Sequence, residues 1–288
     1  MTAFVLGAGL GTRLRPLTAR RPKPLVPVGG RPLITYAFDH LISLGVTRFV
    51  VNTHWCAERY LEFFPGATYR SIPITFVHES PEALETAGGI WNAQEFLKDG
   101  PFVVYNGDIL CSLRLPRALE QHRKSGCEVT LLLRTVGANR NVTFDEKSGA
   151  VLDLRRILRP ELEPGCSFTG IYFVEPQFIA RIPPGQIISV VSIFHEMIRA
   201  GAKVGGLICD DGDWRDLGTR DEYLAANALF PADDGNVIDP TTSIAPNAIL
   251  KNCVVWEKAR VGAGAKLTRC VIADGATAEG EHTDKDFV

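Results

Sequence analysis

The sequence is poor in the features that mark several common classes of protein. It has 7 cysteines in 288 residues, an odd number with no CxxC pair, so neither a disulfide framework nor a zinc site is expected. The formal net charge is only -2, which excludes a polybasic field that would draw the chain to nucleic acid or membrane. No apolar run approaches the length of a membrane span.

The first residues also lack a targeting signal. A basic region followed by a long apolar run is absent before Gly7, so we expect no signal peptide and a cytoplasmic location. In a reducing cytosol, the scattered cysteines are best interpreted as small buried hydrophobic residues.

What the sequence does have is an alternation of strand-like and helix-like segments. Short runs rich in Val, Ile and Phe predict strands at 3–6, 48–52, 74–78, 102–105, 128–135 and 169–174. Apolar residues at helical spacing predict helices at 33–44, 57–64 and 85–97. This pattern predicts an α/β fold, with a Rossmann-like, mostly parallel sheet that becomes mixed in its later part and is flanked by helices.

The pattern of residues changes after Phe230, and residues 231–235 have a composition typical of a linker. Aliphatic residues then recur at six-residue spacing, with one step that is a residue short: Ile238, Ile244, Leu250, Val255, Val261 and Leu267. A hexapeptide period is typical of a β-helix, here expected to be left-handed. We therefore predict two domains, 1–230 and a short β-helix tail at 231–288. The tail should pack on the main domain or on another subunit, which would give a homo-oligomer.

A glycine-rich, basic segment follows the first predicted strand. It reads LGAGLGTRLRPLT at 6–18 and PKPL at 22–25, so backbone N–H groups and three cations lie together in the chain. Arg13, Arg15 and Lys23 supply the local positive charge that a phosphate ligand requires. A dinucleotide-binding turn is the alternative, but it calls for glycine at position 13 and an immediate helix, which the nearby prolines oppose.

Two aspartates stand next to expected secondary-structure elements. Asp108 follows the strand at 102–105, and Asp216 precedes a predicted helix. Carboxylates at the carboxyl ends of strands can bind a hard cation, whereas an isolated Asp in a turn is more often a cap.

These segments resemble the signature of the nucleotide-sugar pyrophosphorylases, the sugar-1-phosphate nucleotidyltransferases. The resemblance implies that Arg13, Lys23 and Asp108 are catalytic and that Asp108 and Asp216 bind Mg2+, the expected cofactor. It implies nucleotide contacts at Leu6, Ala8, Gly9, Gly11, Thr12, Arg13, Lys23, Glu79, Thr86, Ala87 and Gly88. It implies sugar-phosphate contacts at Asn141, Thr169 and Gly170. Plain structural roles remain the alternatives: a helix cap at Thr86 and a strand position at Thr169.

The implied substrates are a nucleoside triphosphate and a sugar 1-phosphate, with no nucleic acid or membrane partner. The string ETAGGI at 85–90 is similar to that of N-acetylmuramate-1-phosphate uridylyltransferases and favours UTP with an N-acetylmuramate- or hexosamine-type sugar. The hexapeptide tail instead favours a mannose- or heptose-1-phosphate guanylyltransferase. Many members of the family carry a sugar-phosphate lysine that is missing here. Either Arg155, Arg156 or Arg159 replaces it, or the site works without this contact, as in the muramate-type members.

Other classes of function stay open. A non-catalytic regulatory paralogue would have the same fold, but such proteins usually lose the lysine or one aspartate of the site. An acyltransferase built on the hexapeptide repeat would need more coils and a histidine within them.

Overall fold

A computed structural model describes residues 1–137, 139–230 and 233–288, and it divides into two compact units. The first unit consists of Met1–Gly9, Tyr36–Gly107 and Cys111–Trp214. The second consists of Leu10–Thr35, Asp108–Leu110 and Arg215–Val288. The basic loop after the first strand thus belongs to the same unit as the C-terminal tail. The predicted linker starts at Pro231 and Ala232, which lie outside the described residues.

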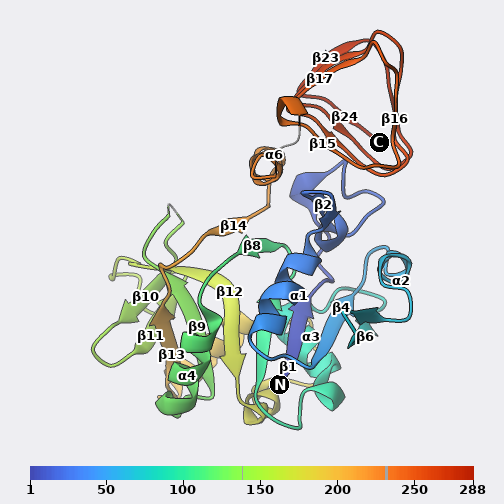
Figure 1. The fold of residues 1–288 in the computed structure, drawn as a ribbon. Helices are drawn as coiled ribbons and strands as arrows, with labels where there is room; N and C mark the ends of the chain where they lie inside the picture. The colour runs from blue at the N-terminus through green and yellow to red at the C-terminus, as the bar shows by residue number, and fades with distance from the viewer. Residues whose placement is uncertain (138, 231–232) are drawn as a thin grey trace. The chain divides into compact units, whose positions relative to one another are not determined.

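The first unit is built on a ten-stranded sheet with the order β10-β11-β13-β9-β12-β7-β1-β4-β6-β5 (Figure 1). Its strands are β1 (Thr2–Leu6), β4 (Arg48–Thr53), β5 (Thr68–Tyr69), β6 (Ile72–His78), β7 (Phe102–Asn106), β9 (Val129–Arg134), β10 (Val142–Asp145), β11 (Ala150–Leu154), β12 (Ser167–Val174) and β13 (Val204–Ile208). Every strand predicted for this region is present, within one or two residues at each end.

The sheet is mixed, and the predicted α/β fold is confirmed. Strands β6, β4, β1 and β7 run parallel, as do β9 and β13. Strand β12 runs antiparallel to both β7 and β9 and so joins the two parallel parts. The nucleotide-contacting residues expected on β1, and the chain that leads to Asp108, therefore emerge at the same edge of the parallel part.

Helices cover both faces of this sheet. They are α1 (Ile34–Ser43), α2 (Glu58–Phe63), α3 (Glu85–Asn92), α4 (Leu115–Ser125) and α5 (Val190–Arg199), with short 3-10 turns η3 (Gln94–Phe96) and η4 (Pro176–Arg181). Because side chains alternate along a strand, Val129, Leu131 and Leu133 pack into one core with α3 and α5. Thr130 faces the opposite way and hydrogen-bonds His122 of α4. Among the described residues, no helix is both long and apolar enough to cross a membrane.

The second unit begins with short elements: η1 (Thr12–Leu14), η2 (Lys23–Leu25), β2 (Pro27–Val28) and β3 (Arg31–Pro32). Two strands, β8 (Ile109–Cys111) and β14 (Trp214–Asp216), carry the chain from one unit into the other. After β14 comes α6 (Arg220–Asn227), and η5 (Asp233–Gly235) leads into the tail.

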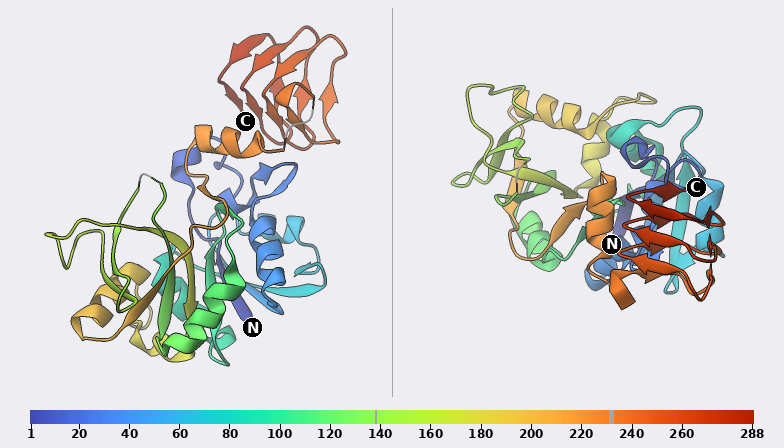
Figure 2. Two further views of the ribbon diagram at one scale, coloured as in Figure 1. Left: turned by 60° about the vertical axis from the view of Figure 1, so that its left-hand side comes forward. Right: turned by 90° about the horizontal axis from the view of Figure 1, so that it is seen from above.

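The tail is a three-sided parallel β-helix (Figures 1 and 2). One side consists of β15 (Val237–Ile238), β18 (Val254–Val255), β21 (Val271–Ile272) and β24 (Asp286–Phe287). The second consists of β16 (Ser243–Ile244), β19 (Arg260–Val261) and β22 (Thr277–Ala278), and the third of β17 (Ile249–Lys251), β20 (Lys266–Thr268) and β23 (Glu281–Thr283).

The short step in the hexapeptide pattern sets the length of the first coils. Residues 17 apart, such as Asn236 and Cys253, occupy equivalent places in successive coils, instead of the about 18 that three full hexapeptides would give. The predicted aliphatic positions from Leu250 to Leu267 fill the interior. Ile238 differs: it is 39% exposed, since it lies on a terminal strand with a neighbour on one side only.

Candidate functional site

The basic loop of the second unit is held in a compact, non-helical form. Gly11 has a φ of 59°, in the left-handed region that favours glycine, and its carbonyl accepts a hydrogen bond from Thr18 Oγ1 at 2.7 Å. Only single 3-10 turns form at Thr12–Leu14 and Lys23–Leu25. The prolines predicted to prevent a regular helix therefore leave a loop that presents Arg13 and Lys23.

Four charged residues singled out from the sequence meet in this unit. The Nζ atom of Lys23 lies 2.8 Å from Asp108 Oδ2 and 3.3 Å from Asp216 Oδ1. The Lys23 side chain is only 7% exposed, while each of the two carboxylates is about one-third exposed. Arg13 Nη2 lies 3.5 Å from Asp216 Oδ2, and its side chain is 66% exposed. A buried lysine therefore joins two carboxylates that solvent can reach, beside an exposed guanidinium that pairs with one of them.

Local structure explains where Asp216 points. It ends β14, and the following helix is capped by Thr219, which forms a capping box with Glu222. The capping role considered for Asp216 is therefore wrong, and its carboxylate turns to Lys23 and Arg13 instead. Gly218 makes room for this arrangement, because a Cβ atom there would lie 2.6 Å from Arg13 Nη1.

The donor set of this cluster matches a small hard cation. Among the described residues, no three His, Cys, Asp or Glu side chains gather to hold a metal without other ligands. Asp108 and Asp216 nevertheless approach one point, since both lie within hydrogen-bond distance of the same nitrogen. Mg2+ is usually bound by one or two carboxylates together with substrate phosphates and water, so the residues present fit it.

In the first unit, the glycine loop is anchored to β4. Gly7 N donates to Asn52 Oδ1 at 2.8 Å, and Tyr60 Oη donates to Gly7 O at 2.9 Å. A Cβ atom on Gly7 would lie 2.7 Å from Asn52 O, so this position needs glycine for packing. Gly9, in contrast, has open space where a Cβ would be. Leu6 ends β1 half-buried, and Ala8 is buried.

Asn52 also holds the segment after β6, which carries the predicted nucleotide contact Glu79. Its Nδ2 donates to Glu79 Oε1 at 2.7 Å, and Leu84 N donates to Glu79 Oε2 at 2.7 Å. Burial raises the pKa of Glu79, and the hydrogen bonds from Leu84 N and Asn52 oppose that rise. Both oxygens of this buried carboxylate are thus engaged in shaping this segment, and a base contact by Glu79 would have to share one of them.

The other predicted nucleotide contacts of this segment lie in the first turns of α3 and are engaged as well. The N–H groups of Ala87 and Gly88 both point to Ile188 O, at 3.0 and 3.2 Å. Thr86 is not a helix cap: its Oγ1 accepts from Val190 N at 2.7 Å, at the start of α5. A Cβ on Gly88 would lie 2.4 Å from Gln186 O, so close packing requires glycine there.

The residues predicted for the sugar phosphate lie around β12. Asn141 Oδ1 accepts from Phe168 N at 3.1 Å. Thr169 is 1% exposed and its Oγ1 donates to Leu132 O at 2.9 Å, as expected of a strand residue. Gly170 has a φ of 79°, and a Cβ there would lie 2.4 Å from Asn106 Nδ2. Their part in sugar binding stays a prediction.

The arginine-rich turn after β11 is ordered by a buried carboxylate. Asp153 Oδ2 accepts from Leu158 N at 3.0 Å and from Arg159 N at 2.8 Å. Arg155 and Arg156 both have positive φ, and Arg156 pairs with Glu163 at 3.0 Å. The turn therefore has a fixed backbone that projects arginines into solvent.

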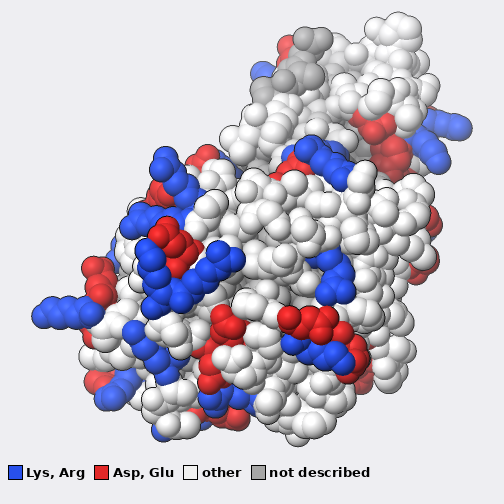
Figure 3. All heavy atoms as spheres, turned by 60° about the horizontal axis from the view of Figure 1, so that its bottom comes forward, with Lys and Arg blue, Asp and Glu red and all other residues white. Residues whose placement is uncertain are grey.

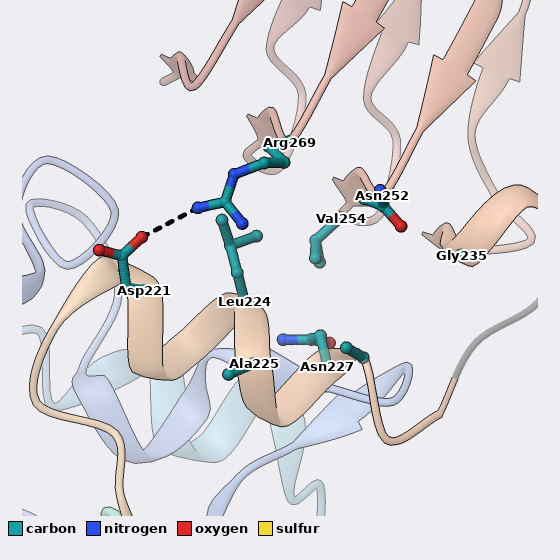
Figure 4. A pocket seen from close by; sticks show the side chains of 9 residues that line it. Asp221, Leu224, Ala225, Asn227, Gly235, Asn252, Val254 and Arg269 are labelled. Carbon is teal, nitrogen blue, oxygen red and sulfur yellow. Dashed lines mark hydrogen bonds and ion pairs between the residues drawn. The ribbon is translucent and has the colours of Figure 1, made fainter.

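Two further surfaces of the described part of the chain differ from this site. On the face in Figure 3, basic and acidic side chains are intermingled. A hollow of about 400 Å³ lies beside α6, lined among others by Leu224, Val254 and Arg269 (Figure 4). None of the predicted site residues lines it. Its arginine is already paired with Asp221 and Asp284, so it does not offer an unbalanced charge to an anion.

Sequence reasoning missed two residues that organise these parts. Asn52 links the glycine loop to Glu79, and Arg21, two positions before Lys23, is buried in the second unit. An asparagine at the carboxyl end of a parallel strand was the available signal for Asn52. No signal in the sequence pointed to Arg21, whose partners lie far away in the chain.

Comparison with known proteins gives a consistent result. The model of the family described as nucleotidyl transferase matches residues 2–232. A mannose-1-phosphate guanylyltransferase of Mycobacterium tuberculosis is 31% identical, over 96% of this chain and 81% of that protein. An N-acetylmuramate alpha-1-phosphate uridylyltransferase of Neisseria meningitidis is 30% identical, over 81% of this chain and 99% of that protein.

The likeness extends to a solved structure. A protein described as a glucose-1-phosphate thymidylyltransferase from Bacillus anthracis superposes with a TM-score of 0.69 and covers 80% of this chain and 95% of its own. The two sequences are 21% identical, so this likeness concerns the fold.

Proposed function

The chain belongs to the nucleotidyl transferase family, and on this premise we propose that it transfers a nucleotidyl group from a nucleoside triphosphate to a sugar 1-phosphate, releasing pyrophosphate. Such a transfer is common to the names of the relatives, although their bases and sugars differ. The observation that carries the proposal is the meeting of Lys23 with Asp108 and Asp216, beside Arg13.

The proposed reaction is a direct displacement. A phosphate oxygen of the sugar 1-phosphate forms a bond to the α-phosphorus of the triphosphate, and the bond from that phosphorus to the bridging oxygen of pyrophosphate breaks. The attacking oxygen is already anionic at neutral pH, so neither a general base nor a covalent nucleophile is required. Catalysis then depends on alignment and on neutralising charge, which is the work of Lys23 and Arg13.

Mg2+ fits this proposal as a cofactor held by Asp108 and Asp216. When bound, it would neutralise phosphate oxygens that the two cations alone cannot balance. In this structure the two carboxylates are paired with Lys23 and Arg13, so the four side chains are balanced in charge. Lys23 would exchange a carboxylate partner for a phosphate when the triphosphate binds.

For the base and sugar, we favour UTP with an N-acetylmuramate- or hexosamine-type 1-phosphate. The support is the ETAGGI string, which forms the first six residues of α3, together with the relative from Neisseria meningitidis. GTP with mannose 1-phosphate or a heptose 1-phosphate is the alternative. It is favoured by the relative from Mycobacterium tuberculosis, whose alignment covers 96% of this chain and so includes the tail.

A non-catalytic paralogue is the alternative from another class. Arg13, Lys23, Asp108 and Asp216 are all present and lie together, which favours an enzyme.

The test is pyrophosphate release, measured for each combination of four triphosphates with several sugar 1-phosphates, with and without excess EDTA. We expect Mg2+-dependent release with one preferred pair, and UTP preferred over GTP. Release with GTP and mannose 1-phosphate would move the assignment to the alternative. No release with any pair, while triphosphate still binds, would favour the paralogue.

A further inference from the structure

Arg21 connects the basic loop to the β-helix tail. Its side chain is 1% exposed, and its guanidinium pairs with Glu257, with Nη1 3.1 Å from Oε2, and with Asp274 at 3.2 Å. Glu257 follows β18 and Asp274 follows β21, which are neighbouring strands on one side of the β-helix. Two successive coils therefore each present one carboxylate to the same arginine.

The tail is connected to the loop on both sides of Lys23, directly at Arg21 and through Tyr223 of α6 at Pro27. On one side, the Arg21 guanidinium lies 4.7 Å from the ring centre of Trp256, a cation–π distance. On the other, Trp256 Nε1 donates to Tyr223 Oη at 2.9 Å, and Tyr223 Oη donates to Pro27 O at 2.7 Å. The backbone that carries Lys23 is thus fixed two residues before it and four residues after it.

The same tail holds the segment that carries Asp216. Arg220 is the first residue of α6, and its Nε donates to Asp286 of the last strand at 2.7 Å. The next residue, Asp221, pairs with Arg269 at 3.0 Å (Figure 4). Both partners of the ion pair between Lys23 and Asp216 are therefore attached, within a few residues, to the β-helix.

Stability alone does not account for these contacts. A buried ion pair gives little net stabilisation compared with apolar side chains of similar size, because both charges lose their hydration. Its geometric effect is stronger: a guanidinium that meets two carboxylates and an indole face has one orientation. A contact of this kind two residues from Lys23 sets the position of the loop.

We propose that the β-helix tail is a positioning element for the phosphate-binding cluster and that Arg21 is the positioning residue that sets Lys23 against Asp108 and Asp216. This inference rests on the proposed function only for its effect on turnover. The placement of Lys23 itself can be measured without any substrate.

The first measurement is the rate at which Lys23 is acetylated by acetic anhydride, which transfers an acetyl group to the amine and releases acetate, followed by peptide mass spectrometry with the exposed lysines as internal references. In Arg21→Met we expect Lys23 to react roughly tenfold faster, since a loosened loop opens to solvent more often. Arg20→Met is the matched control, because Arg20 is the exposed neighbour. An unchanged Lys23 rate in Arg21→Met would overturn the proposal, whatever the activity.

The second measurement separates positioning from general stability. Arg21→Met should lower kcat/KM roughly tenfold to a hundredfold, and Arg21→Lys should restore part of it. In a Lys23→Ala background, the Arg21 substitution should lower kcat/KM by less than about twofold, because Arg21 acts through Lys23. An equal loss in both backgrounds would contradict the proposal.

A change made on the tail covers the case in which Arg21→Met folds poorly. Glu257→Gln combined with Asp274→Asn keeps the shape of both side chains and removes their charge, and it should also speed acetylation of Lys23. If the wild type transfers no nucleotide to any sugar phosphate, but Lys23 still becomes reactive in these variants, the proposed function fails and the positioning stands.

Discussion

At the scale of single residues, Lys23 is the most informative side chain. It is nearly buried, yet it touches two carboxylates that remain accessible to solvent. Replacement by alanine removes the cation that would neutralise a phosphate. We expect Lys23→Ala to lower kcat by about a hundredfold to a thousandfold, the range seen when one charge-stabilising group is lost. Pyrophosphate release under saturating substrates measures this effect.

The matched control is Lys98→Ala. Lys98 is an exposed lysine paired with Glu95 on the same short turn, so its loss should leave both turnover and thermal unfolding nearly unchanged. Turnover of Lys23→Ala within a factor of about three of wild type would show that the charge at this position is not used.

His122 predicts how stability depends on pH. Burial lowers its pKa from the ordinary value of 6.5, while Glu175 opposes the shift. Below that value the unfolded chain takes up a proton first, so the free energy of unfolding falls as the pH falls. The loss from this group is at most about 1.4 kcal/mol per pH unit and ends below the folded-state pKa.

Urea unfolding between about pH 5 and pH 8 checks this sign, since the protonation equilibrium lies in that range. The free energy of unfolding of His122→Gln should fall less steeply with falling pH than that of wild type. Part of the fall should remain, because burial also lowers the pKa of His40. A variant whose stability falls as steeply as that of wild type below pH 6.5 would show that His122 does not supply the slope.

At the scale of elements, sequence patterns predicted most of the fold because they depend on local physics. Short apolar runs located the buried strands, and the six-residue period located the β-helix together with its short step. The helix predicted at 85–97 is divided into α3 and η3. A periodicity of apolar residues does not reveal such a change of hydrogen bonding.

The candidate site was predictable only in part, for a related reason. Arg13 and Lys23 stand out because glycines and cations occur together in one short, unusual segment, and the two aspartates because they match positions of the family signature. Asn52 and Arg21 do not, since each acts through partners far away in the chain: Glu257 is 236 residues from Arg21. The engagement of Ala87 and Gly88 N–H groups by Ile188 O also depends on a distant segment.

Two glycines of the loop that follows β1, Gly7 and Gly9, have different surroundings. Gly7 packs against β4 and Gly9 faces open space, so the same substitution should have different effects two residues apart. Gly7→Ala should lower the free energy of unfolding by about 1–3 kcal/mol through overpacking. Gly9→Ala should change it by less than about 0.5 kcal/mol and weaken triphosphate binding instead.

Thermal unfolding and titration with triphosphate, measured on both variants, separate the two effects. Each variant serves as the control for the other. Equal destabilisation by both substitutions would mean that the fold requires glycine at both positions. Gly9 would then be needed for stability and not for triphosphate binding.

At the scale of the whole molecule, the two compact units are not two stretches of sequence. The tail shares a unit with residues 10–35 and 108–110, so the segments that carry Lys23 and Asp108 fold together with the C-terminal β-helix. The sequence pattern predicted the tail as a separate domain at 231–288. In the structure, the tail supplies partners of the buried Arg21 and of Tyr223.

Deleting residues 231–288 should consequently damage the phosphate-binding cluster as well as the tail. Arg21 would lose both its carboxylates and Trp256, and the Tyr223 hydroxyl would lose its indole donor. We expect the free energy of unfolding to fall by about 3 kcal/mol or more, the usual cost of losing a large buried aromatic side chain such as Trp256. Calorimetry on the shortened chain measures this, and gel filtration reports whether the tail also joins subunits.

A chain that lacks only Val288 is the control, since this residue is 62% exposed and ends the last coil. The two outcomes of the larger deletion have different meanings. A smaller assembly with unchanged stability would make the tail a subunit contact alone, whereas lost stability at the same assembly state would make it part of the fold that holds Lys23. If neither stability nor assembly changed, the tail would have no structural role, and the contacts of Arg21 would be incidental to the folded state.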